Sequence, residues 1–180
     1  MATTKIWKVQ NRLDKVINYA TNKEKTKNNY NEYEFNNINQ VINYATNPDK
    51  TEKQFYTTGI NCEVKNADKQ MQFVKILYGK EKEILAFHAY QSFDEGEVTP
   101  KIAHEIGVKL ANEMWGDRFQ VVVSTHLNTR HLHNHFVINS VSFKDGKKYY
   151  SNLTNTALLR KTSDEICEEY GLSVLKEKTC

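Results

Sequence analysis

The sequence has few of the residues that mark secreted or loosely built proteins. It contains three cysteines, Cys62, Cys167 and Cys180, which are odd in number and form no CxxC pair. A disulfide framework is therefore not expected, and a reducing cytoplasm is the expected location. Only two prolines and seven glycines occur in 180 residues, which argues against long structureless linkers. A single domain over residues 1–180 is the expectation for this length.

Long apolar runs and a strong excess of one charge are also missing. No segment approaches the roughly 20 apolar residues that cross a bilayer. The N-terminus also lacks the apolar stretch of a secretion signal, so we expect no membrane insertion. The net charge is only +3 at pH 7. This mild basicity permits a polyanionic partner without requiring one.

Histidine, in contrast, is concentrated in one place. His126, His131, His133 and His135 are four of six histidines and fall within ten positions. A β-strand expected over residues 131–143 would place His131, His133 and His135 on one face, because strand side chains alternate with period two.

A second strand, expected over residues 119–126, ends at His126. The four-residue connection allows a hairpin that brings His126 beside the His-x-His pair. Three imidazoles on one open sheet face are typical of a divalent-metal site that keeps one coordination position for water or substrate. The two histidines elsewhere, His88 and His104, are expected to have structural or incidental roles.

The periodicity of the remaining chain predicts an α/β fold. Strands are expected over residues 5–9, 54–62, 84–93, 119–126 and 131–143, and helices over 11–20, 41–47, 66–79, 99–116 and 155–170. Together these elements predict a roughly five-stranded, mainly antiparallel sheet with helices packed on one side of it.

One heptapeptide occurs twice. Val-Ile-Asn-Tyr-Ala-Thr-Asn occupies residues 16–22 and returns unchanged at residues 41–47. Two copies are too few for a repeat protein, so a duplicated helix end is the simpler interpretation. Each copy carries one tyrosine, Tyr19 or Tyr44. A tyrosine at a helix end usually packs its ring and exposes its hydroxyl, so the spacing alone does not indicate catalysis.

The pattern His126-x4-His131-x-His133-x-His135-x3-Asn139 resembles the third motif of plasmid mobilisation relaxases of the MobA/VirD-like, MOB-P class, in the HUH endonuclease superfamily. The segments 59–62 and 91–99 are similar to segments of the same family. The resemblance extends from the N-terminus to about Leu175.

This resemblance implies a strand-specific DNA nickase and transesterase with a relaxase-like fold. Such enzymes act on single-stranded DNA at a transfer origin through a 5′-phosphotyrosine and so initiate conjugative mobilisation. The implied metal ligands are His126, His133 and His135, with His131 near the nucleophile or behind the ligands. Mn²⁺ or Mg²⁺ is the expected metal, and Zn²⁺, Ni²⁺ and Co²⁺ are alternatives for an imidazole site. Auxiliary mobilisation proteins and a coupling protein are implied partners.

The family has one catalytic tyrosine, whereas this chain offers two. Counting back from the segment 59–62 favours Tyr44, and counting from the N-terminus favours Tyr19. We prefer Tyr44. Relatives often carry acidic residues where this chain has Asn128 and Arg130. The base that takes the tyrosine proton is therefore open, with His131 or a hydroxide on the metal as candidates.

Two other functions are compatible with the same motif. A rolling-circle replication initiator shares the His-x-His and tyrosine chemistry, although the resemblance outside the motif argues against it. A non-enzymatic DNA-binding module with a structural metal is disfavoured, because structural sites usually close with four ligands. The run Lys147-Lys148-Tyr149-Tyr150 interleaves charge with aromatic rings, as single-strand binders often do.

Overall fold

The computed structural model describes residues 2–9, 37–46, 56–81, 84–127 and 130–174. The strands are β1 (Thr3–Val9), β2 (Thr57–Ile60), β3 (Ala86–Ser92), β4 (Val121–His126) and β5 (His133–Asn139). The helices are α2 (Ile38–Ala45), α3 (Ala67–Leu77), α4 (Pro100–Ala111) and α5 (Leu153–Glu169). A 3-10 turn, Val64–Asn66, precedes α3, and a π-helical turn, Asn112–Gly116, follows α4. The helix expected over residues 11–20 lies outside the described residues.

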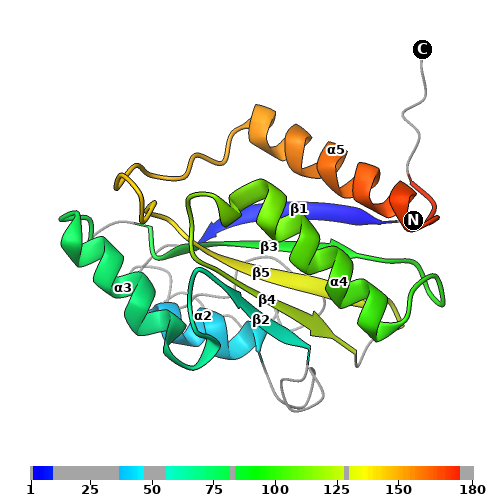
Figure 1. Cartoon of the computed structure of the whole chain (residues 1–180), viewed down its shortest axis with the longest axis horizontal. Coiled ribbons are helices and arrows are strands. Elements are labelled where there is room, and N and C mark those ends of the chain that lie inside the picture. The colour runs from blue at the N-terminus through cyan, green and yellow to red at the C-terminus, as the bar shows by residue number, and fades with distance from the viewer. Residues whose placement is uncertain (1, 10–36, 47–55, 82–83, 128–129, 175–180) are drawn as a thin grey trace, which may run out of the picture.

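The five strands form one antiparallel sheet in the order β1-β3-β5-β4-β2 (Figure 1). This arrangement confirms the predicted fold class. The strands that carry the predicted triad, β4 and β5, are neighbours in the middle of the sheet, and His126 is paired with His133 in their register.

The helices begin where the sequence supplies a cap. Asn37 Oδ1 accepts a hydrogen bond from Gln40 N at 3.0 Å and so caps α2. Thr99 Oγ1 accepts one from Ile102 N at 3.3 Å at the start of α4, where Pro100 already has helical φ. None of the described helices is long and apolar enough to span a membrane.

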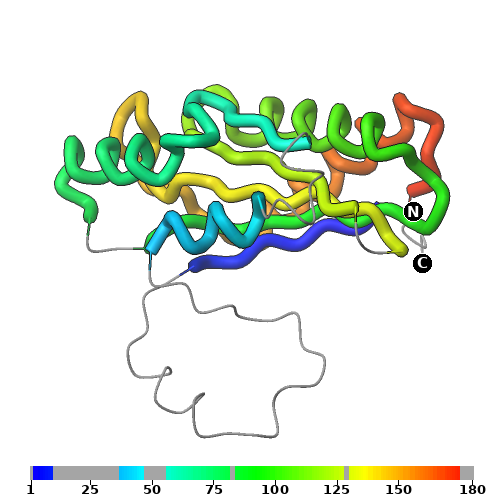
Figure 2. Tube along the Cα trace, turned by 90° about the horizontal axis from the view of Figure 1, so that it is seen from below, coloured from blue at the N-terminus to red at the C-terminus, as the bar shows by residue number. Residues whose placement is uncertain are grey.

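Helices cover both faces of the sheet, so the expectation of helices on one side is wrong. On one face, α4 and α5 pack over side chains such as Phe87, Val123 and Phe136. On the other face, α2 packs over Val122 and Val137, together with the start of α3. Figure 2 shows the sheet from its edge, with α4 on one side and α2 on the other. The central strands are apolar on both faces, and each apolar face must be buried.

Candidate metal centre

The β4–β5 hairpin brings three histidines together on the face covered by α2. His126 ends β4, its partner His133 begins β5, and His135 lies two residues farther on. One ring nitrogen from each of the three lies within 4.8 Å of the others. The ring centroids of His126 and His135 are 4.1 Å apart, and those of His133 and His135 are 4.8 Å apart. The three imidazoles of the predicted triad therefore lie close together on one face of the sheet.

Two of these rings are oriented by backbone carbonyls. His126 Nε2 donates to the carbonyl of Ala45 at 2.7 Å, and His133 Nδ1 donates to that of His131 at 3.0 Å. A carbonyl only accepts, so each neutral ring carries its proton at that nitrogen and has a lone pair at the other. An imidazole fixed in this way is ready to bind a metal, since metal-bound histidines typically donate their second nitrogen to such a partner.

The third ring, His135, contacts His88 instead. His88 lies on β3, is buried, and places Nε2 at 2.9 Å from His135 Nδ1. Burial, together with the nearby His126, lowers the pKa of His88 to about 3. His88 is therefore neutral near pH 7 and can accept the Nδ1 proton of His135. That arrangement leaves His135 Nε2 with a lone pair for a metal.

Sequence reasoning placed His88 among the structural histidines and missed this contact. The signal was present but weak. His88 lies within an expected strand, where side-chain alternation allows it to face the same side as His135. Only the strand order shows that β3 lies next to β5.

Tyr44 lies against the same cluster from α2. The carbonyl of Ala45, the next residue, accepts hydrogen bonds from both His126 Nε2 and Ser124 Oγ, which ties the end of the helix to β4. The Tyr44 ring meets the rings of His88, His126 and His135 edge-on, at centroid distances of 6.0, 6.2 and 5.8 Å. The alternative nucleophile, Tyr19, lies outside the described residues.

A tyrosine beside a histidine triad on a five-stranded sheet fits the predicted family. The family described as "Relaxase: MobA/VirD2-like, nuclease domain" matches residues 44–172. The chain belongs to this family. The matched range begins at Tyr44 and includes the three histidines. The relaxase resemblance predicted from the motifs is thereby confirmed.

Among similar proteins, two are named rlx and a third is named as a relaxase. Two Staphylococcus aureus proteins named "Protein rlx" are 44% and 45% identical over 117 residues, which cover 65% of this chain and 36% and 37% of theirs. The "Group II intron-interrupted relaxase LtrB" of Lactococcus lactis subsp. cremoris (strain MG1363) is 29% identical over 114 residues, covering 54% of this chain and 20% of that protein. This relaxase chain therefore spans little more than a third of the length of the rlx proteins that it matches.

A solved structure described as "Molecular Basis of Vancomycin Resistance Transfer in Staphylococcus aureus" overlays with a TM-score of 0.48 at 16% identity. The overlay covers 68% of this relaxase chain and 75% of that chain.

The fourth histidine of the relaxase motif, His131, is not on the strand. β5 begins only at His133, so the predicted alternation does not reach His131, and its expected position on the same strand face is wrong. Its side chain is 54% exposed, its Nδ1 donates to the carbonyl of Phe93 at 3.1 Å, and Asp94 Oδ1 is 3.7 Å away. His131 thus flanks the triad and, through its backbone carbonyl, orients His133.

The predicted Lys147–Tyr150 run lies at the opposite end of the sheet. It lines a cavity of about 500 Å³ with residues such as Arg118 and Phe119, which precede β4. His126 is at the far end of that strand, about 17 Å away at the usual rise per residue. Tyr149 packs its ring against Phe87 and Phe119, whereas Tyr150 is 69% exposed.

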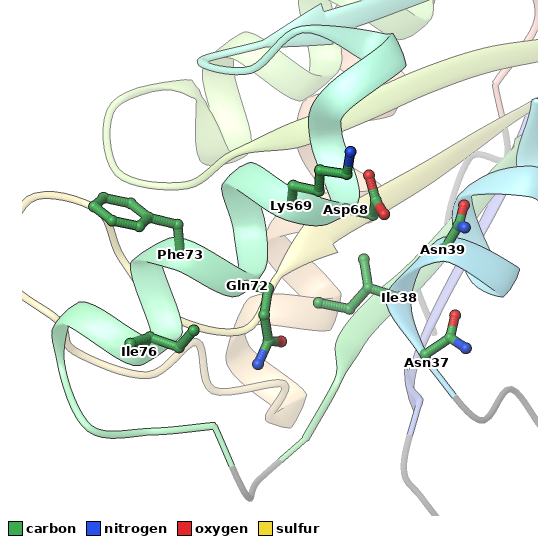
Figure 3. Close-up of a pocket in the computed structure, with 8 residues that line it drawn as sticks. All are labelled: Asn37, Ile38, Asn39, Asp68, Lys69, Gln72, Phe73 and Ile76. Carbon is green, nitrogen blue, oxygen red and sulfur yellow. The ribbon is translucent and has the colours of Figure 1, made fainter.

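Another cavity, of about 620 Å³, lies between the start of α2 and the outer side of α3 (Figure 3). Phe73 and Ile76 of α3 and Ile38 of α2 line it, with polar side chains around them. None of the predicted site residues is among the residues that line it.

Proposed function

We propose that this chain is a metal-dependent nickase and transesterase that cuts one DNA strand at a transfer origin and forms a 5′-phosphotyrosine, initiating mobilisation. One observation carries the proposal: the Tyr44 ring centroid lies 6.2 Å from that of His126 and 5.8 Å from that of His135, and both histidines belong to the triad whose ring nitrogens lie within 4.8 Å of one another. Family membership supplies the substrate class, since the matched family is a relaxase nuclease domain.

The donor set fits a divalent cation. Three imidazole nitrogens within 4.8 Å of one another are in reach of one ion, and the carbonyl-bound rings of His126 and His133 each keep a second nitrogen that carries no proton when the ring is neutral. His126, His133 and His135 would hold the ion. When bound there, it would polarise the scissile phosphate and offset the charge that builds on its oxygens. Mn²⁺ or Mg²⁺ is our proposed metal, with Zn²⁺, Ni²⁺ and Co²⁺ as alternatives.

The proposed reaction exchanges one ester bond for another. The Tyr44 hydroxyl oxygen attacks the phosphorus, the bond from phosphorus to the 3′-oxygen breaks, and the 3′-oxygen leaves and takes up a proton. The phenolic proton passes to a base, for which His131 is the candidate. Because one phosphoester replaces another, the reverse attack by the 3′-hydroxyl rejoins the strand.

Tyr44→Phe is the deciding variant. The protein is incubated with Mn²⁺ and a labelled single-stranded oligonucleotide from the transfer origin, and the covalent adduct is separated on a denaturing gel. We expect the adduct with the unaltered chain and with Tyr19→Phe, and none with Tyr44→Phe, because phenylalanine keeps the ring but lacks the attacking oxygen.

The converse result, with cleavage retained by Tyr44→Phe and lost in Tyr19→Phe, would make Tyr19 the nucleophile. An adduct with none of the origin strands would sink the enzymatic proposal and favour a DNA-binding module with a structural metal. A rolling-circle initiator would instead form its adduct with a replication-origin strand.

Two wider proposals accompany this one. The five described strands form one sheet, which supports our proposal that residues 1–180 are a single nicking domain. Auxiliary mobilisation proteins and a coupling protein are proposed partners on the strength of the family alone.

A further inference from the structure

The sheet face that carries the histidines continues beyond them onto β3 and the edge strand β1. In the strand register, Tyr90 is opposite His135, and Lys5 is opposite Tyr90. Trp7 is opposite His88 in the same way. Directly opposed residues of an antiparallel sheet point to the same face. Lys5, Trp7 and Tyr90, here called the aromatic strip, therefore lie on the histidine face, beginning one strand away from the triad.

The aromatic strip is packed within itself and against the site. The rings of Trp7 and Tyr90 meet edge-on at 6.0 Å, and the ring of Trp7 lies 4.6 Å from that of His88. Lys5 Nζ is 6.0 Å from the centre of the Trp7 ring, a distance at which a cation is attracted to the π-face. The strip is thus continuous with the histidines that surround Tyr44.

Burial distinguishes the strip from the other aromatic residues of the sheet. Phe87 and Phe136 are fully buried beneath α4 and α5 on the opposite face. Trp7 and Tyr90 are only half-buried, Lys5 is exposed, and neither ring belongs to the two apolar clusters formed by the described residues. Two partly exposed rings beside an exposed lysine are of little use to a core but suit a ligand with flat faces and negative charge.

We propose that the aromatic strip is a base-stacking subsite for the single-stranded DNA next to the scissile phosphate. Bases stack on Trp7 and Tyr90, and Lys5 neutralises a backbone phosphate. Stacked aromatic rings beside positive charge are the usual means of holding single strands without reading sequence. Tyr90 lies one strand spacing from His135, and the β1 residues of the strip lie two strand spacings, about 10 Å, from it. A DNA strand that enters the site from this edge of the sheet therefore crosses the strip. The position of the bound strand relative to a scissile phosphate rests on the proposed nickase function, whereas the stacking of bases on the strip does not.

The binding test uses two probes of equal charge in EDTA, where metal-dependent cleavage is prevented. One is a labelled oligothymidylate of about 12 nucleotides, and the other is an abasic strand of the same length. The unaltered chain should bind the thymidylate at least about 5-fold more tightly. Trp7→Leu, which keeps apolar volume without a π-face, should lose this preference and bind the two probes with about equal affinity. Lys5→Ala should weaken both probes and reduce the salt slope by about 0.7.

Phe73→Ala is the matched control, because Phe73 is an aromatic residue 64% exposed on α3. It should retain the preference for bases. Thermal unfolding of each variant separates lost stacking from lost structure, and Tyr90→Ala repeats the test at the second ring. Equal affinity of the unaltered chain for both probes would overturn the proposal.

Tryptophan fluorescence gives a readout that a merely structural role would not move. The chain has two tryptophans, and Trp115 is only 2% exposed in the core. Bases stacking on Trp7 should quench the emission of the unaltered chain and of Trp115→Phe, but not that of Trp7→Leu. Quenching of equal size in Trp7→Leu would place the bases elsewhere.

The adduct assay separates the two proposals. Base-dependent binding with no adduct on any origin strand would leave the subsite standing and remove the nickase function. An adduct formed by a chain that binds both probes equally would do the reverse.

Discussion

The two faces of the central sheet both bury polar side chains, but they use them differently. On the α4 face, a closed chain of hydrogen bonds, meaning one whose donors and acceptors all belong to the protein, runs in one direction. Thr58 donates to His104 Nε2 at 2.8 Å, His104 Nδ1 donates to Thr125 at 2.9 Å, and Thr125 donates to Asn134 Oδ1 at 2.7 Å. Asn134 then donates to Gln91 at 3.0 Å and to the carbonyl of Ala103 at 2.7 Å.

On the α2 face, the residues on either side of Asn134 behave in the opposite way. His133 and His135 each hydrogen-bond to a protein partner through Nδ1, and each also offers a ring nitrogen that lies within 4.8 Å of those of the other triad members. A buried polar group whose hydrogen bonds are all made within the protein contributes to the fold. Imidazole nitrogens that gather at one place instead indicate a ligand site. Neighbouring residues on β5 thus differ by the face they occupy: Asn134 completes a hydrogen-bond network within the protein, whereas His133 and His135 belong to the proposed metal site.

Removing one proposed metal ligand should produce the largest difference in metal affinity between variants of the two faces. His135→Ala takes away one of three imidazoles, so its affinity for Mn²⁺ or Co²⁺ should fall by more than about 100-fold, beyond the effect of losing an outer partner. His104→Ala, on the other face, should leave metal affinity unchanged and lower the free energy of unfolding instead. Isothermal titration of both variants measures the contrast. Equal metal affinity in His135→Ala and the unaltered chain would contradict the ligand assignment.

The sequence predicted the proximity of the three histidines but not the ends of the strand that carries two of them. The strand period and the hairpin spacing were enough to place His126, His133 and His135 together, because both are local properties of adjacent strands. The expected strand over residues 131–143 was too long, since His131 turns to the carbonyl of Phe93 before pairing begins. Strand ends depend on such tertiary bonds and are not encoded in alternation.

The contacts from distant elements were beyond sequence reasoning from the residues. His88 reaches His135 only because β3 inserts between β1 and β5, and strand order is a property of the whole sheet. Tyr44 was chosen through family resemblance, because an amphipathic tyrosine at a helix end has no distinguishing periodicity. Helices on both faces could have been expected from the central strand Val121-Val122-Val123, whose consecutive apolar residues face both sides.

Disrupting the hydrogen-bond chain on the α4 face should lower the free energy of unfolding without changing metal affinity. Asn134→Leu retains volume but removes the donor to Gln91 Oε1 and the acceptor of the Thr125 hydroxyl proton, both buried, so the free energy of unfolding should fall by about 2–4 kcal/mol. Gly107→Ala tests the same network from α4, because a Cβ there would lie 2.5 Å from Asn134 Nδ2. Urea unfolding and metal titration should show both variants destabilised with unaltered metal affinity. A weaker metal site in either would mean that the two faces are coupled.

The subtlest difference lies between the two histidines that sequence treated alike, His88 and His104. If His88 orients His135 by accepting its Nδ1 proton, His88→Phe should weaken Co²⁺ binding by about 10- to 100-fold, as the loss of an outer partner does. His88→Gln should retain part of that affinity, because its amide oxygen can accept the same proton. Metal titration and the visible spectrum of the Co²⁺ form report the ligand geometry independently of nicking. If His88→Phe binds Co²⁺ as tightly as His104→Phe, then His88 merely fills space, and the carbonyl-bound rings of His126 and His133 suffice to organise the site.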